Sequence, residues 1–195
     1  MNSELPATPA RVVVGITGAS GAIYGVRLLA ALAALGVETH LILTAPGEAT
    51  LIHETDFTPD QVRAMAAYDY APGDIGAPIA SGSFATNGMV VAPCSIKTLS
   101  AIASSFTDNL LARAADVALK EGRTLILAVR ETPLHLGHLR LMVRAAEIGA
   151  VIFPPLPAFY GHPNSVEALV DQSVGRIISR LGFENDLYPV WKGLA

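Results

Sequence analysis

Residues 12–35 read VVVGITGASGAIYGVRLLAALAAL and constrain the fold more than any other stretch of the chain. The apolar, β-branched run Val12–Ile16 is typical of a strand buried on both faces. Small residues follow at Thr17–Gly21, and apolar residues then recur at helical spacing from Ile23 to Ala33. Such a turn can bind an anion, because the free N–H groups of the helix N-terminus and the helix dipole point the same way. A tight connection without any ligand is the alternative interpretation.

Two familiar nucleotide motifs are absent from the sequence. Gly15, Gly18 and Gly21 are three residues apart, so the dinucleotide fingerprint G-x-G-x-x-G is not present. The second expected strand, Glu38–Thr44, ends in a threonine rather than in the acid that would hold a ribose. No G-x-x-x-x-G-K-[ST] motif occurs either. A mononucleotide or another phosphate therefore remains as the expected ligand class.

Strands alternate with helices along the rest of the chain. Further strands are expected at Gly88–Ala92, Thr124–Val129 and Ala150–Phe153, and helices at Glu48–Glu54, Pro59–Ala67, Leu99–Ser105, Asp108–Glu121, Leu134–Ile148 and Pro163–Leu181. Residues 68–87 show no regular pattern. The alternation predicts an α/β fold, a doubly wound parallel sheet of the Rossmann-like kind in a single domain. That domain is expected over residues 11–181, between a flexible arm at 1–10 and a tail at 182–195.

Composition limits the partners and the compartment. The net charge of −4 gives no electrostatic case for nucleic acid. Hydrophobic residues make up 51% of the chain and charged residues 15%, yet no run reaches the roughly 18 apolar residues of a membrane span. The surplus of apolar surface indicates burial between copies of the chain in a homo-oligomer. The N-terminus lacks the basic and apolar regions of a signal peptide, so a cytoplasmic protein without membrane association is expected.

Polar residues gather directly after the expected strands, at Ser20, Thr44, Ser95 and Arg130–Glu131. In a doubly wound sheet these positions face one crevice. Ser95 and Thr98 are either helix N-caps or donors to a phosphate or flavin edge. Glu131 lies where catalytic acids and bases are placed, although an Arg–Glu pair that closes the loop is the alternative.

Basic residues form a second candidate set. Arg113 and Lys120 are seven residues apart on an expected helix and therefore share one face. Alone they would be solvated charges. With Arg130, Tyr160 and Arg176 they indicate a second anion site, because arginine donates a fork of hydrogen bonds that fits phosphate oxygens.

The cysteine and the histidines give weaker evidence for a catalytic or metal-binding site. Cys94 is the single cysteine, which excludes an internal disulfide and a multi-cysteine metal site. It could be a nucleophile, but no His or Asp partner pattern accompanies it, so a buried structural thiol is favoured. His135 and His138 share one helix face, and without a third ligand they are interpreted as ordinary helix residues rather than as a metal site.

Six stretches of the sequence carry a family resemblance. They are TGASGAIYGVRLL (Thr17–Leu29), ASGSF (Ala80–Phe84), PCSIKTLSAI (Pro93–Ile102), RAADVALKE (Arg113–Glu121), VRETPLHLGHLRLM (Val129–Met142) and PAFY (Pro157–Tyr160). Together they resemble the UbiX family of flavin prenyltransferases over nearly the whole chain. The resemblance implies a flavodoxin-like fold, a homododecamer and FMN as the bound substrate. It also implies dimethylallyl monophosphate as prenyl donor and prenylated FMN as product, passed to a UbiD-type decarboxylase.

The resemblance further implies a role for each matching residue. The FMN contacts would be Gly18, Ala19, Ser20, Thr44, Ser95, Ile96, Lys97, Thr98 and Arg130. The dimethylallyl phosphate would lie among Arg113, Lys120, Arg130, Glu131, Tyr160 and Arg176, some of them from neighbouring subunits. Glu131 and Ser20 would be catalytic without any metal, while Ala19 and Ala80 would shield the allyl group from water. Where many members read Ser-Lys after the second strand, this chain reads Thr44-Ala45-Pro46-Gly47, which is expected to break the chain before the next helix.

The implied reaction needs a flavin nucleophile and a stabilised leaving group. Flavin N5 and C6 would bond to the dimethylallyl group, and cationic groups would stabilise charge on the departing phosphate. An FMN-dependent decarboxylase of the cysteine decarboxylase type is one alternative, although its PASANT-type motif is replaced here by PCSIKT. A non-catalytic flavin-carrying subunit of a decarboxylase complex is the other, although flavin storage needs no second phosphate site.

Overall fold

Strand β1 (Arg11–Ile16) lies inside the sheet, and its side chains are buried on both faces in the computed structural model, which describes residues 9–193. Val12, Val14 and Ile16 belong to one hydrophobic cluster, whereas Val13 belongs to the cluster on the opposite face. Successive residues of a strand point to opposite faces, so an uninterrupted apolar run can fill both.

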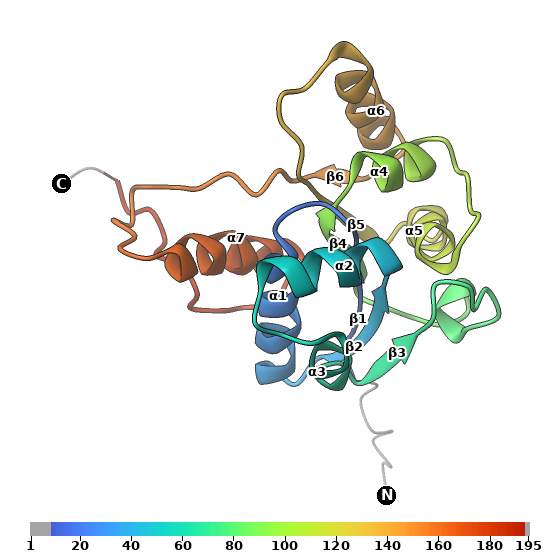
Figure 1. Ribbon diagram of the computed structural model, residues 1–195, viewed down its shortest axis with the longest axis horizontal. Coiled ribbons are helices and arrows are strands. Elements are labelled where there is room, and N and C mark those ends of the chain that lie inside the picture. Colours follow the sequence, from blue (N-terminus) through green and yellow to red (C-terminus); the bar gives the residue numbers. More distant parts are fainter. Residues whose placement is uncertain (1–8, 194–195) are drawn as a thin grey trace, which may run out of the picture.

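A parallel sheet of six strands carries the fold, with helices on both faces (Figure 1). The other strands are β2 (Glu38–Leu43), β3 (Tyr68–Tyr70), β4 (Gly88–Cys94), β5 (Thr124–Val129) and β6 (Val151–Ile152). The helices are α1 (Ala22–Ala34), α2 (Ala45–Glu54), α3 (Pro59–Ala64), α4 (Ile96–Ala103), α5 (Leu110–Lys120), α6 (Leu136–Glu147) and α7 (Val166–Arg180), with a 3-10 turn η1 (Pro78–Ala80). No helix among these is long and apolar enough to cross a membrane.

The strand order is β3-β2-β1-β4-β5-β6, and every pairing is parallel. Without the short edge strand β3, this is the flavodoxin-like order, and with it the six-stranded Rossmann order. The predicted doubly wound parallel sheet is therefore confirmed. The chain winds outward from β1 through β2 and then returns to β4 on the other side of β1. The crevice at the carboxyl ends of β1 and β4 is where such sheets bind ligands.

Two hydrophobic clusters hold the helices to the sheet. Helices α1 and α7 pack in one cluster, through residues such as Leu29 and Ile177, while α4 and α5 pack in the other, through Leu99 and Leu111. The tail at 182–195, as far as residue 193, folds back on α7, where the Asn185 side-chain amide donates to the Gly175 carbonyl at 3.1 Å. The expected arm at 1–10 lies outside the described residues except for its last two positions.

Several local predictions are wrong for identifiable reasons. The three-residue strand β3 lies in the segment 68–87, which was expected to be irregular, because a short exposed edge strand has no apolar periodicity. Helix α2 begins at Ala45 rather than at Glu48, since a proline is tolerated in the first helical turn. Helix α5 begins at Leu110, after the cap Asn109, rather than at the expected Asp108.

The predicted start of α4 is also wrong. Ser95 is the N-cap and the helix begins at Ile96, three residues before the predicted start at Leu99. Strand β6 is likewise shorter than the predicted Ala150–Phe153.

Gly25 tests the packing of α1 on the sheet. An added Cβ would overlap the Ala92 carbonyl oxygen and meet Ile16 Cγ1 at 2.6 Å. Glycine to alanine in a helix interior normally stabilises by up to about 1 kcal/mol, but Gly25→Ala should lower the free energy of unfolding by about 1–3 kcal/mol, the usual cost of overpacking. Urea unfolding followed by circular dichroism measures this.

The control is Gly76→Ala, where the nearest atom to an added Cβ is Asp74 Oδ1 at 3.7 Å. Its free energy of unfolding should change by less than about 0.5 kcal/mol. Equal stability of the Gly25→Ala variant and the parent chain would show that α1 can move away from β4 at little cost.

Candidate active site

Three helices begin at the carboxyl ends of β1, β2 and β4, and two of them are capped by side chains. Thr44 is the N-cap of α2 and accepts a hydrogen bond from Gly47 N at 3.1 Å. Ser95 is the N-cap of α4 and accepts from Thr98 N at 3.3 Å. Ser95 is therefore a helix N-cap, one of the two roles expected for it, and N–H groups of the first turn of α4 have no partner inside the helix.

Thr17 ties the first turn to the fourth strand. Its hydroxyl donates to the Pro93 carbonyl at 2.7 Å and accepts from Ser95 N at 2.9 Å, and the residue is only 2% exposed. The turn itself packs closely, because a Cβ at Gly18 would overlap Pro46 in the first turn of α2. Glycine at this position therefore lets the turn after β1 lie against the start of α2.

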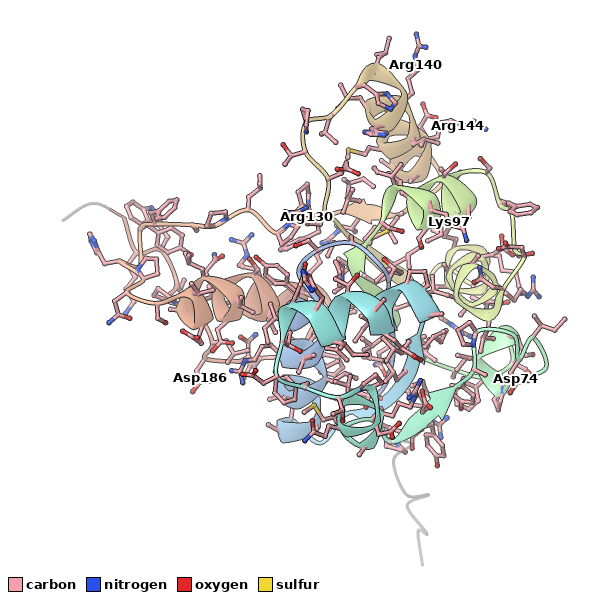
Figure 2. All side chains as sticks on the ribbon, viewed as in Figure 1. Asp74, Lys97, Arg130, Arg140, Arg144 and Asp186 are labelled. Carbon is pink, nitrogen blue, oxygen red and sulfur yellow. The ribbon has the colours of Figure 1, made fainter. Side chains whose placement is uncertain are left out.

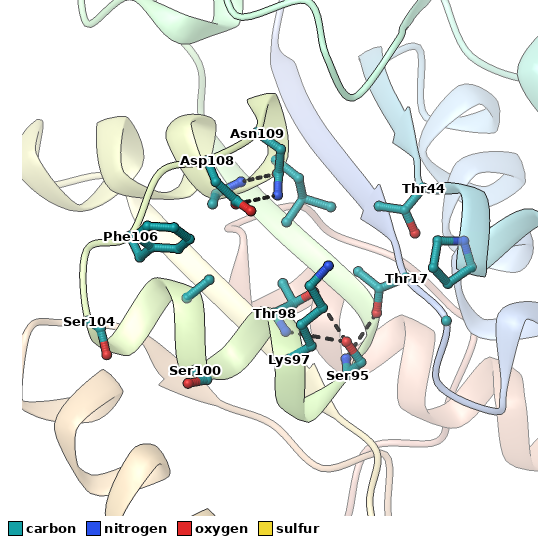
Figure 3. Close-up of a pocket in the computed structure, with 15 residues that line it drawn as sticks. Thr17, Thr44, Ser95, Lys97, Thr98, Ser100, Ser104, Phe106, Asp108 and Asn109 are labelled. Atoms are coloured by element: carbon teal, nitrogen blue, oxygen red, sulfur yellow. Dashed lines mark hydrogen bonds between the residues drawn. The ribbon is translucent and has the colours of Figure 1, made fainter.

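A cavity of about 760 Å³ opens between these turns (Figure 3). This volume falls within the usual range for small-molecule sites. Five of the residues expected to contact FMN line it, namely Gly18, Thr44, Ser95, Lys97 and Thr98. Lys97 brings a positive charge to the wall formed by α4, and Asp108 brings a negative charge to the facing wall.

The connection between α4 and α5 forms a wall that the sequence interpretation missed. Ser104, Phe106, Asp108 and Asn109 line the cavity from this connection. Asn109 is also the cap of α5, since its side-chain oxygen accepts from Ala112 N at 3.0 Å. An Asp-Asn pair before an apolar helix indicates a cap, and no local pattern shows that the same loop faces a ligand.

The other expected FMN contacts lie elsewhere. Ala19, Ser20 and Arg130 do not line this cavity, and Ile96 lines a second cavity of about 570 Å³ between α4 and α6. Figure 2 shows Lys97 and Arg130 on either side of the turn after β1.

Glu54, at the end of α2, reaches the turn on the side of Ser20, and sequence reasoning missed it. Its carboxylate accepts from Gly21 N at 2.7 Å and from Ala22 N at 3.3 Å. Burial alone would raise the pKa of Glu54, but hydrogen bonds from Ser20, Gly21 and Ala22 and the charge of Arg130 outweigh burial and lower it. Glu54 is therefore ionised, and it satisfies the N-terminus of α1 that the sequence indicated as an anion site.

Glu131 is exposed, and its carboxylate accepts from Thr132 N at 3.0 Å. No ion pair joins it to Arg130 within residues 9–193, so the alternative of an Arg–Glu pair closing this loop is not what the structure shows. The carboxylate is thus available to a ligand at the end of β5.

The basic set is divided within one chain. Arg113 and Lys120 lie on α5, whereas Arg176 lies on α7 and Tyr160 in the extended segment before it, on the opposite side of the molecule (Figure 1). The Tyr160 hydroxyl donates to the Pro189 carbonyl at 3.1 Å, and Arg176 lies 5.8 Å from the Tyr188 ring. One copy of the chain does not bring these residues together.

Cys94 and the histidine pair have local roles. Cys94 is fully buried, and burial raises the pKa of its thiol to about 12. His135 caps α6 by accepting from Gly137 N at 3.0 Å, and its ring lies 3.6 Å from that of His138. Among residues 9–193 no three His, Cys, Asp or Glu side chains are placed to hold a metal ion.

A doubly wound parallel sheet with phosphate-competent turns at its switch point defines a mononucleotide-binding α/β protein. The flavoprotein family model matches residues 2–178. The chain is 54% identical over 183 residues to the flavin prenyltransferase UbiX of Thauera aromatica, which covers 94% of each chain. The chain therefore belongs to the flavoprotein family and, within it, to the UbiX flavin prenyltransferases.

Solved structures agree with this assignment. The crystal structure of AnUbiX (PadA1) in complex with FMN and dimethylallyl pyrophosphate has a TM-score of 0.95 and 49% identity, covering 96% of this chain and 100% of that one. A dodecameric FMN-dependent UbiX-like decarboxylase from Escherichia coli O157:H7 has a TM-score of 0.91 and 44% identity, covering 94% and 100%. The cysteine decarboxylase SpaF, at 17% identity and a TM-score of 0.61, shares the fold alone.

The burial of Cys94 predicts an inert thiol. Thiolates are the reactive form of cysteine, and a pKa of about 12 leaves almost none at neutral pH. With Ellman's reagent at about pH 8, near the pKa of a free thiol, the folded protein should release no colour within the time that free cysteine reacts fully. The chain unfolded in guanidinium chloride is the control and should show one thiol. Rapid labelling of the folded protein would instead support a nucleophilic Cys94.

Proposed function

We propose that this chain joins the dimethylallyl group of dimethylallyl monophosphate to N5 and C6 of reduced FMN, and releases prenylated FMN and phosphate. The observation that carries the proposal is the cavity at the switch point, which gathers Gly18, Thr44, Ser95, Lys97 and Thr98. Support comes from the 49% identical structure in complex with FMN and dimethylallyl pyrophosphate.

The cavity suits the phosphate end of FMN. N–H groups of the first turn of α4 and the hydroxyl of Thr98 lie at one end, and Lys97 adds a positive charge. Phosphate at a helix N-terminus is stabilised by unsatisfied N–H groups and by the helix dipole. The tight packing of Gly18 on Pro46 brings the backbone of the first turn close to the same space.

The flavin supplies the nucleophile, and the residues of this chain bind and orient the two substrates and stabilise the departing phosphate. We assign Glu131 and Ser20 as catalytic residues, with Ala19, Ile96 and Arg130 completing the flavin site. Ser20 hydrogen-bonds the Glu54 carboxylate, and the positive charge of Arg130 also acts on that carboxylate. A polar group of the ligand near Ser20 would therefore meet the negative charge of Glu54 and the positive charge of Arg130. Ala19 and Ala80 would exclude water from the allyl group.

The phosphate of the prenyl donor would bind Arg113, Lys120, Arg130, Glu131, Tyr160 and Arg176. Because α5 and α7 lie on opposite sides of one chain, these residues can converge only if several copies contribute (Figure 1). We therefore infer a homo-oligomer, with twelve copies as in the dodecameric relative. The exposed apolar side chains of α6, Leu136, Leu139 and Val143, support burial against another copy.

The product chemistry also suggests the partner and the compartment. Prenylated FMN is the product of the proposed reaction and must therefore be used by another enzyme. A UbiD-type decarboxylase is the inferred acceptor. We place the reaction in the cytoplasm. Neither nucleic acid nor a metal has a role in it.

Product analysis tests the function. The protein should convert reduced FMN and dimethylallyl monophosphate, under anaerobic conditions, into a flavin heavier by one dimethylallyl group, seen by mass spectrometry. A parallel reaction with dimethylallyl pyrophosphate shows which leaving group the site accepts. A flavin carrier would bind FMN and leave its mass unchanged, and a cysteine decarboxylase would release carbon dioxide from a peptide ending in cysteine.

Glu131→Gln tests the catalytic carboxyl group. The change keeps the shape of the side chain but removes an ionisable proton, and protonation of a departing phosphate lowers the barrier to its release. Single-turnover formation of prenylated FMN should slow about 10²–10⁴-fold, with FMN affinity retained. Asp56→Asn, at an exposed carboxylate between α2 and α3, is the control and should react at the parent rate. A Glu131→Gln variant as fast as this control would mean that Glu131 only positions the substrate.

A further inference from the structure

Arg123 holds the segment Ala80–Phe84 against the end of α5. One guanidinium donates to the Gly82 carbonyl at 2.5 Å and to the Phe84 carbonyl at 2.8 Å. The Phe84 ring is fixed from its other side, with Arg11 4.8 Å from its centroid and the buried His40 ring 5.1 Å away. A segment without regular structure is therefore anchored at both its backbone and its aromatic side chain.

Arg113 rests on the same segment. Its Nε donates to the Ala80 carbonyl at 3.2 Å, and Nη1 donates to Asp116 at 3.2 Å. These two contacts fix the plane of the guanidinium. Within residues 9–193 its Nη2 group has no hydrogen-bond partner, so it can donate to an anion.

Lys120 lies directly over the backbone of Gly82. Its ammonium donates to Glu121 Oε1 at 2.5 Å. A Cβ added at Gly82 would overlap the Glu121 carboxylate and would meet Lys120 Nζ at 2.7 Å. The backbone of Gly82 is not in the left-handed region, so glycine is needed here for space rather than for conformation.

We propose that the segment Ala80–Phe84, clamped by Arg123, positions Arg113 and Lys120 for the phosphate of the prenyl donor, and that Gly82 is required because any side chain there would displace Lys120. Gly82 and Arg123 are positioning residues, since they act through Arg113 and Lys120. The inference rests on the proposed function, which makes that phosphate the ligand of the two cations.

The test is the affinity of dimethylallyl monophosphate for the protein loaded with oxidised FMN, measured by titration calorimetry. Oxidised flavin is not a nucleophile, so binding is measured without turnover. Gly82→Ala should weaken binding about tenfold, the loss expected when one charged hydrogen bond to phosphate is removed. FMN affinity and the melting temperature should stay at the parent values, because the displaced atoms are the ends of two flexible side chains.

A matched control and a double variant separate positioning from general damage. Gly73→Ala adds the same methyl group in open space and should bind as the parent does. In a Lys120→Met background, Gly82→Ala should cause no further loss, since the group it displaces is already gone. Additive losses would show that Gly82 does not act through Lys120 and would overturn the proposal.

Arg123→Met provides a second way to move the segment if Gly82→Ala fails to fold. It should weaken dimethylallyl monophosphate binding with FMN affinity retained, and Arg123→Lys should restore part of the loss. Parent affinity in both Gly82→Ala and Arg123→Met would overturn this inference but leave the proposed function standing. A parent protein that binds no dimethylallyl monophosphate would overturn both.

Discussion

The hydroxyl of Thr17 is the interaction on which the site depends. It joins the end of β1 to the carbonyl of Pro93 and to the N–H group of Ser95, and so fixes the turn after β1 against the turn after β4. A buried hydroxyl left without partners would cost about 1–3 kcal/mol, so the two turns hold one another in place. Both turns line the cavity, with Gly18 from the first and Ser95 from the second.

Burial explains why much of this arrangement was predictable. The strands β1, β4 and β5 are largely apolar runs because the sheet is covered on both faces, and a run of this kind is visible in the sequence. The turn residues follow from the strand ends. The strand β3, by contrast, pairs with β2, and the rings of Tyr68 and Tyr70 stack on His40 of that strand, a contact that no local pattern reveals.

The site residues that come from distant segments of the chain were not predictable either, because no local pattern shows a contact between distant segments. Glu54 bonds to Gly21 in the turn after β1, although it lies 33 positions further along the chain. Phe106 and Asp108 line the cavity from a loop whose sequence indicates only a helix cap. The family resemblance gave the basic residues as one set, whereas a single chain places α5 and α7 apart (Figure 1). A sequence carries no information on which copies of a chain lie side by side, so the proposed phosphate site can be assembled only from several copies.

The charges beside the N-termini of α1 and α4 determine which of the two helices can bind a nucleotide phosphate. The N–H groups that open α1 are already bonded to the ionised carboxylate of Glu54, so a phosphate there would meet a like charge. The start of α4 carries no acidic residue in its first turn and has Lys97 beside it. A phosphate is therefore better accommodated beside Lys97 and Thr98 than at the glycine turn from which the sequence interpretation began. The Glu54 end of the crevice is left for a part of the ligand that can donate hydrogen bonds to a carboxylate.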